Sequence, residues 1–314
     1  MTEQDSHFEI AIIGSGPAGF TAAIYATRGG ASTALFGGMA PGGQLLQTME
    51  IENYPGFVDP VVGADLMSNM LRQVTRLGAK VFQDSITGLD LSARPFRLKA
   101  GSGKDYTADA VILATGAQAR WLGTPSEEKY KGKGVSGCAT CDGFFYRGKE
   151  VCVIGGGDTA AEDTLFLTKF AAKVYLVHRR DQLRASFRLQ EKLKANPKVE
   201  IIYDHIPEEF TGEAKLSAVN LKNVKTGAIR RLDVTGAFIA IGHTPATGLV
   251  KDKLKLDEGG YVVTDEKTAT SVPGVYAAGD VMDTRYKQAV VAAGTGCKAA
   301  LEALAFIEAG DAHS

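Results

Sequence analysis

The feature that most constrains the fold is one pattern of strand, glycine turn, helix and strand that occurs twice. In "FEIAIIGSGPAGFTAAIYATRGGASTALFG" the apolar runs at 8–13 and 32–36 predict strands, and residues 17–27 between them predict a helix. The second copy is "KEVCVIGGGDTAAEDTLFLTKFAAKVYLVHRR", with strands expected at 151–154 and 173–177 and a helix at 159–170. Such βαβ units build parallel, doubly wound sheets. The sequence therefore predicts an α/β protein with two Rossmann-like dinucleotide-binding domains.

Two further runs predict how the domains are threaded. "DAVILATGAQ" (109–118) and "GAFIAIGHTP" (236–245) each read as a buried strand that ends in a glycine turn, as expected for the closing strand of a domain. We therefore expect one discontinuous domain, residues 1–117 and 248–314, with residues 118–247 inserted into it. The two short crossings favour a hinge.

Composition excludes several other classes of protein. The chain has 314 residues, a formal charge of −1 and a pI near 6.5, which argues against a non-specific nucleic-acid binder and offers no basic patch for lipids. No uninterrupted apolar run reaches the roughly 20 residues of a membrane span, and residues 1–9 are too polar for a signal peptide. We expect a cytoplasmic protein without a membrane partner, where structural disulfides rarely persist.

The first glycine motif, Gly14-x-Gly16-x-x-Gly19, follows a strand and opens a helix. In that context its glycines allow a tight turn and the close approach of a pyrophosphate to the helix N-terminus. The acidic residue that normally binds a ribose at the end of the second strand is replaced by Phe36. The glycine-rich stretch 37–44 that follows is interpreted as a loop around a bulky dinucleotide, with an ordinary surface loop as the alternative.

The second motif, Gly155-x-Gly157-x-x-Ala160, is followed at the end of its second strand by "HRRDQLR" (178–184). Guanidinium groups form strong, often bidentate bonds to phosphate. The motif therefore predicts a site that prefers NADPH to NADH, and an arginine cluster on a solvated helix start is the alternative.

The four cysteines fall into two kinds. Cys152 and Cys297 stand singly among apolar or small residues and are expected to be buried, inert thiols. Cys138 and Cys141 form a Cys-x-x-Cys pair, which either binds metal or exchanges thiols and disulfides. No second pair supplies the four ligands that zinc normally takes, so no metal site is expected. Thiol exchange is favoured, with Asp142 next in the chain able to exchange a proton with sulfur.

Together "CATCDG", "GGGDTAAED", "HRRDQLRAS" and "AAGDVMDTRYKQAVVAAGTGC" resemble the low-molecular-weight thioredoxin reductases, from "IIGSGPAG" to "GTGC". The resemblance implies a homodimer that holds FAD in the discontinuous domain and NADPH in the inserted one. It also implies that Cys141 faces the flavin, Cys138 attacks the disulfide of thioredoxin and Asp142 donates and accepts the proton. The inserted domain would rotate between the two half-reactions.

The same resemblance assigns the cofactor-binding residues by matching motifs. The residues implied for FAD are Ser15, Gly16, Pro17, Ala18, Gly19, Gly37, Gly38, Gly42, Gly43, Gln44, Asn53, Ile86, Asp280, Lys287, Gln288, Ala289 and Val290. The residues implied for NADPH are Gly157, Thr159, His178, Arg179, Arg180, Arg184, Ile241 and Tyr261. Many relatives carry Arg where this chain has Lys287, a change that keeps the charge but loses the planar fork.

Three other functions are compatible with parts of the pattern. A flavoprotein of this fold that takes electrons from ferredoxin or a deazaflavin would have little use for the arginines of "HRRDQLR". The reductase of a peroxiredoxin system would typically carry extra N-terminal domains, and only a few residues precede the first expected strand. A non-catalytic FAD scaffold or redox sensor would not need both a Cys-x-x-Cys pair and an NADPH site.

Overall fold

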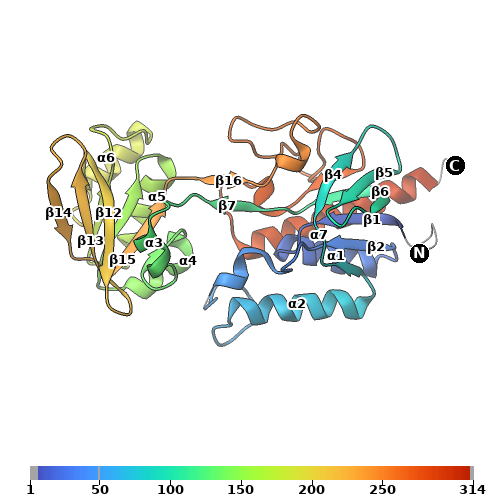
Figure 1. The fold of residues 1–314 in the computed structure, drawn as a ribbon, viewed down its shortest axis with the longest axis horizontal. Helices are drawn as coiled ribbons and strands as arrows, with labels where there is room; N and C mark the ends of the chain where they lie inside the picture. Colours follow the sequence, from blue (N-terminus) through green and yellow to red (C-terminus); the bar gives the residue numbers. More distant parts are fainter. Residues whose placement is uncertain (1–5, 49, 312–314) are drawn as a thin grey trace. The chain divides into compact units, whose positions relative to one another are not determined.

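The computed structural model describes residues 6–48 and 50–311 and divides the chain into two compact units. Unit 1 comprises the chain up to Gln118 and from Thr244 onward, and unit 2 comprises Ala119–His243. The expected α/β architecture, with one Rossmann-like unit inserted in the other, is confirmed. The connecting segments β7 (Ala117–Ala119) and β16 (His243–Pro245) pair with each other as a two-stranded ladder (Figure 1).

Unit 1 is built on a seven-stranded sheet in the order β3-β2-β1-β6-β5-β4, and β17 also pairs with β6. Strands β1, β2, β3, β6 and β17 are parallel to one another, whereas β5 pairs antiparallel with both β6 and β4. The strands are β1 (His7–Ile13), β2 (Thr33–Phe36), β3 (Lys80–Phe82), β4 (Ile86–Asp90), β5 (Phe96–Ala100), β6 (Asp105–Leu113) and β17 (Val275–Ala277). Its helices are α1 (Pro17–Arg28), α2 (Gly63–Leu77) and α7 (Ala289–Asp311), with 3-10 turns η2 (Gly43–Gln47), η4 (Gly248–Val250) and η5 (Gly279–Val281).

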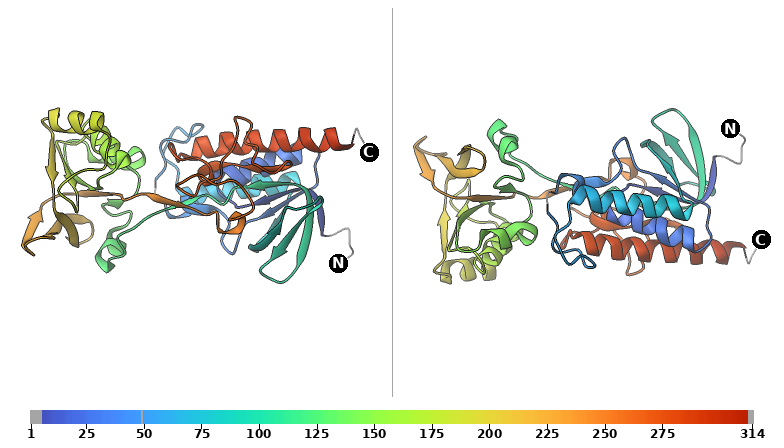
Figure 2. Two further views of the ribbon diagram at one scale, coloured as in Figure 1. Left: turned by 90° about the horizontal axis from the view of Figure 1, so that it is seen from above. Right: turned by 90° about the horizontal axis from the view of Figure 1, so that it is seen from below.

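Strand β1 shows why this sheet is buried on both faces. Successive side chains of a strand point to opposite faces, so Ile10 and Ile12 pack with α1, α2 and α7, whereas Ala11 and Ile13 pack with β4 and β5. Figure 2 shows the three helices lying along one face of the unit, in blue, cyan and red. Because β1, β2 and β6 are parallel, their carboxyl ends meet at one edge of the sheet, where α1 begins.

Helix α7 corrects the expectation that no segment is long and apolar enough to cross a bilayer. Ala289–Gly310 meets both criteria, with a mean hydropathy of 1.5. The sequence reasoning counted only uninterrupted apolar runs, and Lys298 and Glu302 interrupt this one. The composition has a packing reason, because small residues let α7 approach α1 closely: a Cβ at Gly296 would lie 2.1 Å from the carbonyl oxygen of Ala18.

Unit 2 contains a five-stranded parallel sheet in the order β11-β10-β9-β15-β8. These strands are β8 (Val135–Ser136), β9 (Glu150–Gly155), β10 (Lys173–Val177), β11 (Val199–Ile202) and β15 (Gly236–Ala240). The helices are α3 (Pro125–Tyr130), α4 (Ala139–Asp142), α5 (Asp158–Leu167) and α6 (Phe187–Ala195), with the 3-10 turn η3 (Gly143–Tyr146). As in unit 1, alternate residues of the central strand β9 enter two cores: Cys152 and Ile154 enter one, Val151 and Val153 the other.

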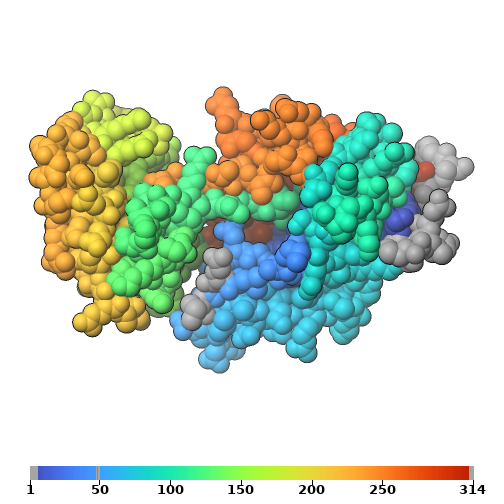
Figure 3. Space-filling view, viewed as in Figure 1, coloured from blue at the N-terminus to red at the C-terminus, as the bar shows by residue number. Residues whose placement is uncertain are grey.

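A second, antiparallel sheet covers one core of unit 2. It is formed by β12 (His205–Gly212), β13 (Leu216–Asn223) and β14 (Ile229–Leu232). Its inner face carries apolar residues such as Phe210, Val219 and Leu221, whereas its other face is exposed and appears in yellow and gold in Figure 3. The hairpin between β13 and β14 therefore lies at the surface of the unit.

Candidate active site

The Cys-x-x-Cys pair forms a disulfide at the start of a short helix. The Cα atoms of Cys138 and Cys141 are 5.3 Å apart and their sulfurs are bonded. Cys138 precedes α4 as its N-cap, and the backbone N–H of Cys141 donates to Cys138 Sγ at 3.2 Å. Cys141 is exposed and Cys138 is half-buried. The pair is thus held by one helical turn on unit 2 and is open to reaction at the surface.

Asp142 lies at the end of this turn in an environment that favours its protonated form. Burial raises the pKa of its carboxyl group, and a hydrogen bond from Ser136 opposes that rise. Ser136 Oγ also accepts a hydrogen bond from the Cys138 N–H at 3.0 Å. Tyr146, nearby, has its pKa raised to about 12, first by burial and then by the charge of Asp142. A carboxyl group poised in this way is suited to proton exchange with sulfur.

The other two cysteines differ from each other. Cys152 is fully buried in β9, and burial raises the pKa of its thiol to about 12, so it is inert as expected. Cys297 on α7 is only half-buried, which corrects the expectation of a buried thiol. The reason is that it lies at the margin of the core beside Tyr25, with which it forms a hydrogen bond that raises the tyrosine pKa.

The glycine turn of unit 1 leaves an open cradle at the N-terminus of α1. Gly14 has a φ of 116°, and a Cβ there would lie 2.1 Å from the carbonyl oxygen of Ala114. A Cβ at Gly19 would lie 1.9 Å from Gly14 O, so the turn packs tightly on that side. Gly16, the N-cap of α1, has nothing within 4 Å of its Cβ position. The described residues thus fit a pyrophosphate group at the N-terminus of α1.

Ser15 joins this turn to the glycine-rich loop 37–44. Its hydroxyl donates to Gly37 O at 2.9 Å and accepts from the N–H of Gly42 at 3.1 Å. The loop requires glycine, because Gly42 and Gly43 have φ values of 141° and 66°. Gln44 Nε2 donates to Ala117 O, which fixes the end of the loop near the start of β7.

A charged cluster follows β17 in the same unit. Asp280, in η5, has its pKa raised to about 6, chiefly by burial and also by the charge of Asp283. Lys287 has a φ of 48° and a pKa lowered by burial. The ammonium group of Lys287 donates to Thr284 O at 2.7 Å and lies 5.3 Å from the ring centroid of Tyr261.

This cluster brings several of the expected FAD residues together. Asn53 Nδ2 donates to Gln288 Oε1 at 3.3 Å, and Ala289 and Val290 open α7 directly after Gln288. Ile86 begins β4 just beyond Asp84, whose carbonyl oxygen accepts from the N–H of Gly38. Tyr261, which the resemblance implies for NADPH, lies in unit 1 with the FAD set, whereas every other expected NADPH residue lies in unit 2.

The glycine turn of unit 2 shares the contact pattern of the first. A Cβ at Gly155 would lie 2.4 Å from Ala240 O, whereas Gly157, the N-cap of α5, has open space around it. Strand β15 pairs with β9 so that Ala240 lies opposite Gly155, and Ile241 follows at the same edge. The residues beside this turn thus fit a second pyrophosphate, and exposed Thr159 lies in the first turn of α5.

The arginine segment folds back onto this turn. The backbone N–H groups of Arg184 and Ala185 donate to Gly156 O at 2.7 and 3.1 Å, and Ser186 N donates to Asp158 Oδ1 at 2.6 Å. The side chains of Arg179, Arg180 and Arg184 are exposed, and none of the three forms an ion pair within residues 6–48 and 50–311.

His178 differs from the arginines because it lies beneath the turn. It is 5% exposed, and a Cβ at Gly156 would lie 2.2 Å from its Nδ1. Its pKa is lowered, first by burial and also by the charges of Arg184 and Arg180, so the ring is held neutral. Its Nε2 has no hydrogen-bond partner in the described part of the chain. His178 therefore supports the turn, and the exposed arginines supply the charge.

Sequence reasoning missed Ser136, Asp283 and Thr295. Thr295 Oγ1 accepts from Gly279 N at 2.9 Å and thereby holds η5 against α7. Asp283 Oδ2 accepts from Lys287 N at 2.9 Å. No sequence motif marks these contacts, apart from the position of Ser136 two residues before Cys138. Among the residues that the structure describes, no group of three or more His, Cys, Asp or Glu side chains is placed to hold a metal ion.

Comparison with known proteins agrees with this geometry. Residues 8–296 match the family model described as pyridine nucleotide-disulphide oxidoreductase. A thioredoxin reductase of Rickettsia conorii is 49% identical over 303 residues, which cover 95% of this chain and 98% of the relative. The structure of thioredoxin reductase from Giardia duodenalis has a TM-score of 0.93 at 43% identity and covers 96% of this chain and 99% of that one. The enzyme from Streptococcus pyogenes has a TM-score of 0.92 at 41% identity, with coverage of 97% and 99%. The chain therefore belongs to the pyridine nucleotide-disulphide oxidoreductases and, among them, to the low-molecular-weight thioredoxin reductases.

Proposed function

We propose that this chain transfers the electrons of NADPH, through FAD, to the Cys138–Cys141 disulfide and from there to the disulfide of thioredoxin. The observation that carries the proposal is that one unit holds a surface disulfide next to a half-buried carboxyl group and also holds a glycine turn flanked by three exposed arginines that form no ion pair with the described residues. Family membership supports the use of both cofactors.

Unit 1 is proposed as the FAD domain and unit 2 as the NADPH domain. In unit 1 the N-terminus of α1 would hold the pyrophosphate, and the loop at 37–44 would enclose the rest of that half of the cofactor. Asp280 and Lys287 would contact the part nearer the flavin. In unit 2 the N-terminus of α5 would hold the NADPH pyrophosphate, and the arginines would bind the 2′-phosphate.

The protein's own groups act mainly on protons and thiolates. When bound, FAD would supply the two-electron chemistry that links NADPH to a disulfide. Cys141 is proposed as the sulfur that faces the flavin and Cys138 as the nucleophile toward thioredoxin. Asp142, whose pKa burial raises, holds a proton to give to the departing thiolate and takes one from the attacking thiol.

We also propose that the two crossings act as a hinge. The disulfide and the NADPH residues lie on the same unit, yet both must reach one flavin, so each is expected to do so in turn. Gly116 and Gly242, with φ values of 75° and 105°, directly precede the crossing strands β7 and β16. Hinge motions are absorbed by a few such backbone positions.

A homodimer in the cytoplasm is proposed on the family resemblance. A sedimentation measurement on the FAD-loaded protein tests the dimer, since a monomer at micromolar concentration would contradict it. Neither a membrane nor a nucleic acid is proposed as a partner.

The activity is tested by mixing the FAD-loaded protein anaerobically with NADPH or NADH and following the flavin absorbance. Fast bleaching by NADPH and a weak response to NADH are expected, followed by reoxidation when oxidised thioredoxin is added. No bleaching by either nucleotide would contradict the proposal and favour an enzyme reduced by ferredoxin or a deazaflavin.

A further inference from the structure

The backbone of the arginine segment is bonded to the neighbouring segment 202–205. His178 N donates to Ile202 O at 2.9 Å, His205 N donates to His178 O at 3.0 Å, and Asp204 N donates to Arg180 O at 3.2 Å. Asp204 has a φ of 56°, a left-handed conformation that Asp tolerates better than most residues. Asp204 is therefore the residue through which this segment fixes the main chain of Arg180.

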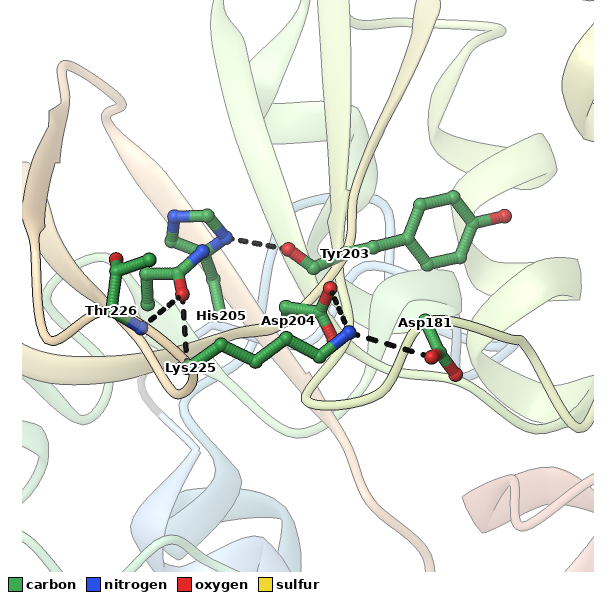
Figure 4. Close-up of polar contacts among 7 residues, drawn as sticks. Asp181, Tyr203, Asp204, His205, Lys225 and Thr226 are labelled. Carbon is green, nitrogen blue, oxygen red and sulfur yellow. Dashed lines mark hydrogen bonds and ion pairs between the residues drawn. The ribbon is translucent and has the colours of Figure 1, made fainter.

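The hairpin between β13 and β14 is bonded to the same aspartate. Val224 N donates to Asp204 O at 2.8 Å. The hairpin is rigid at this point, because Asn223 Oδ1 accepts from the N–H groups of Lys225 and Thr226, both at 2.9 Å. Figure 4 shows the result: the Lys225 side chain runs back from the hairpin and places its ammonium group between Asp204 and Asp181.

The distances make Lys225 the counter-ion of both carboxylates. Its Nζ is 2.9 Å from Asp204 Oδ2 and 3.4 Å from Asp181 Oδ2. The pKa of Lys225 is raised, chiefly by its hydrogen bond to Asp204. Asp181 directly follows Arg180 in the chain, so its carboxylate lies in the segment that would bind an anion. Without Lys225, two uncompensated negative charges would adjoin the three arginines.

We propose that Lys225 is a positioning residue of the 2′-phosphate site: by pairing with Asp181 and Asp204 it offsets one of their two negative charges and holds the arginine segment in place, and thereby strengthens the preference for NADPH over NADH. The inference rests on the proposed function of unit 2 as the NADPH domain. It places a determinant of cofactor choice on a hairpin about 40 residues beyond the arginine motif.

The test is calorimetric titration of the FAD-loaded protein with 2′,5′-ADP and with 5′-AMP, which differ only in the 2′-phosphate. Lys225→Met is expected to weaken 2′,5′-ADP about threefold at low ionic strength and to leave 5′-AMP unchanged. A roughly threefold loss of affinity is what the removal of one charge acting across solvent should cause, and this loss should become smaller in 0.5 M salt. KM for NADPH should rise by the same factor, with KM for NADH constant.

Three further variants separate charge from structure. Lys222→Met removes the same charge from the adjoining strand β13, where Lys222 pairs with Glu208 at 2.9 Å, and should change neither titration. Lys225→Arg should keep the preference. Lys225→Met combined with Asp181→Asn should recover it, because that pair of changes restores the net charge while the contact to Asp204 stays broken.

The outcomes distinguish this inference from the proposed function. If the unsubstituted protein binds 2′,5′-ADP no better than 5′-AMP, both are overturned. If it prefers 2′,5′-ADP but Lys225→Met changes nothing, only the role of Lys225 is overturned. An equal loss for both probes, without rescue by Asp181→Asn, would show a general structural role and would also overturn it.

Discussion

Replacing Ser136 by Ala tests how the proton of Asp142 is controlled. The Ser136 hydroxyl donates to the Asp142 carboxylate and so lowers a pKa that burial raises. A hydrogen bond to a charged group contributes about 1.5–3 kcal/mol, and one pKa unit corresponds to about 1.4 kcal/mol. Since Asp142 keeps some contact with water, we expect the pKa to rise further by about one unit when the hydroxyl is lost.

The sign follows from the proposed role of Asp142 as a proton donor. The donor is active while protonated, so activity is lost as the pH rises through its pKa. In Ser136→Ala this basic limb should therefore move upward by about one pH unit, whereas Asp142→Asn should abolish it and reduce turnover about 100-fold or more.

The assay is kcat/KM for thioredoxin across the pH range in which the protein stays folded, compared with the rate of flavin reduction by NADPH, which should not change. Thr140→Ala is the matched control, because its hydroxyl lies 3.4 Å from Cys138 Sγ and is lost from the same turn. A basic limb that stays in place in Ser136→Ala, or moves to lower pH, would refute the reasoning.

Three other changes have definite expectations. Cys141→Ser should leave flavin bleaching by NADPH intact and abolish thioredoxin reduction, and rapid mixing separates the two steps. Gly14→Ala should yield protein without the yellow colour of bound FAD, because φ is 116° and the new Cβ would lie 2.1 Å from Ala114 O. Gly103→Ala is the control, since Gly103 has a φ of 84° but open space around its Cβ position. That change should cost only about 1 kcal/mol of stability. Asp163, whose pKa burial raises to about 7, binds its proton more tightly folded than unfolded, so the free energy of unfolding should fall as the pH rises from about 4 to about 7. Asp163→Asn should remove that fall and raise the free energy of unfolding at pH 8 by about 2 kcal/mol. This is less than the full pKa shift implies, because the side chain is only half-buried. Equal melting curves for the two proteins at pH 8 would argue against this reasoning.

The sequence was sufficient for the parts of the fold that depend on local pattern. Strand β1 and helix α1 have the bounds that the apolar runs and the glycine turn predict, within a residue. A buried parallel strand shows in the sequence as a continuous apolar run, and a turn position with a left-handed backbone strongly favours glycine. The insertion of unit 2 also followed from local signals, because each closing strand carries its own glycine turn.

Several side-chain contacts could not be predicted in this way. Ser136 reaches Asp142 only because α4 turns the chain back, and Lys225 reaches Asp181 only because β12 to β14 fold over the core. The half-buried state of Cys297 is of the same kind, since it depends on which face of α7 meets α1. In each case the contact depends on how the chain folds in space, which the pattern of apolar and polar residues does not show.

The two units also show how one fold comes to bind two different nucleotides. In dinucleotide-binding folds, a residue at the end of the second strand normally meets the ribose. In unit 1 the second strand ends in Phe36, whose ring packs in the core and stacks on Phe82 with centroids 5.1 Å apart. No charged side chain therefore stands at the end of this strand, and the glycine-rich loop follows it directly. In unit 2 the second strand ends at Val177, and the side chain of the next residue, His178, is buried. The first exposed charged side chain after this strand is that of Arg179. Because both turns pack their first glycine against the closing strand and leave the N-cap glycine open, we expect the choice of nucleotide to depend on the few residues that follow each second strand, with Lys225 proposed to act on their charge.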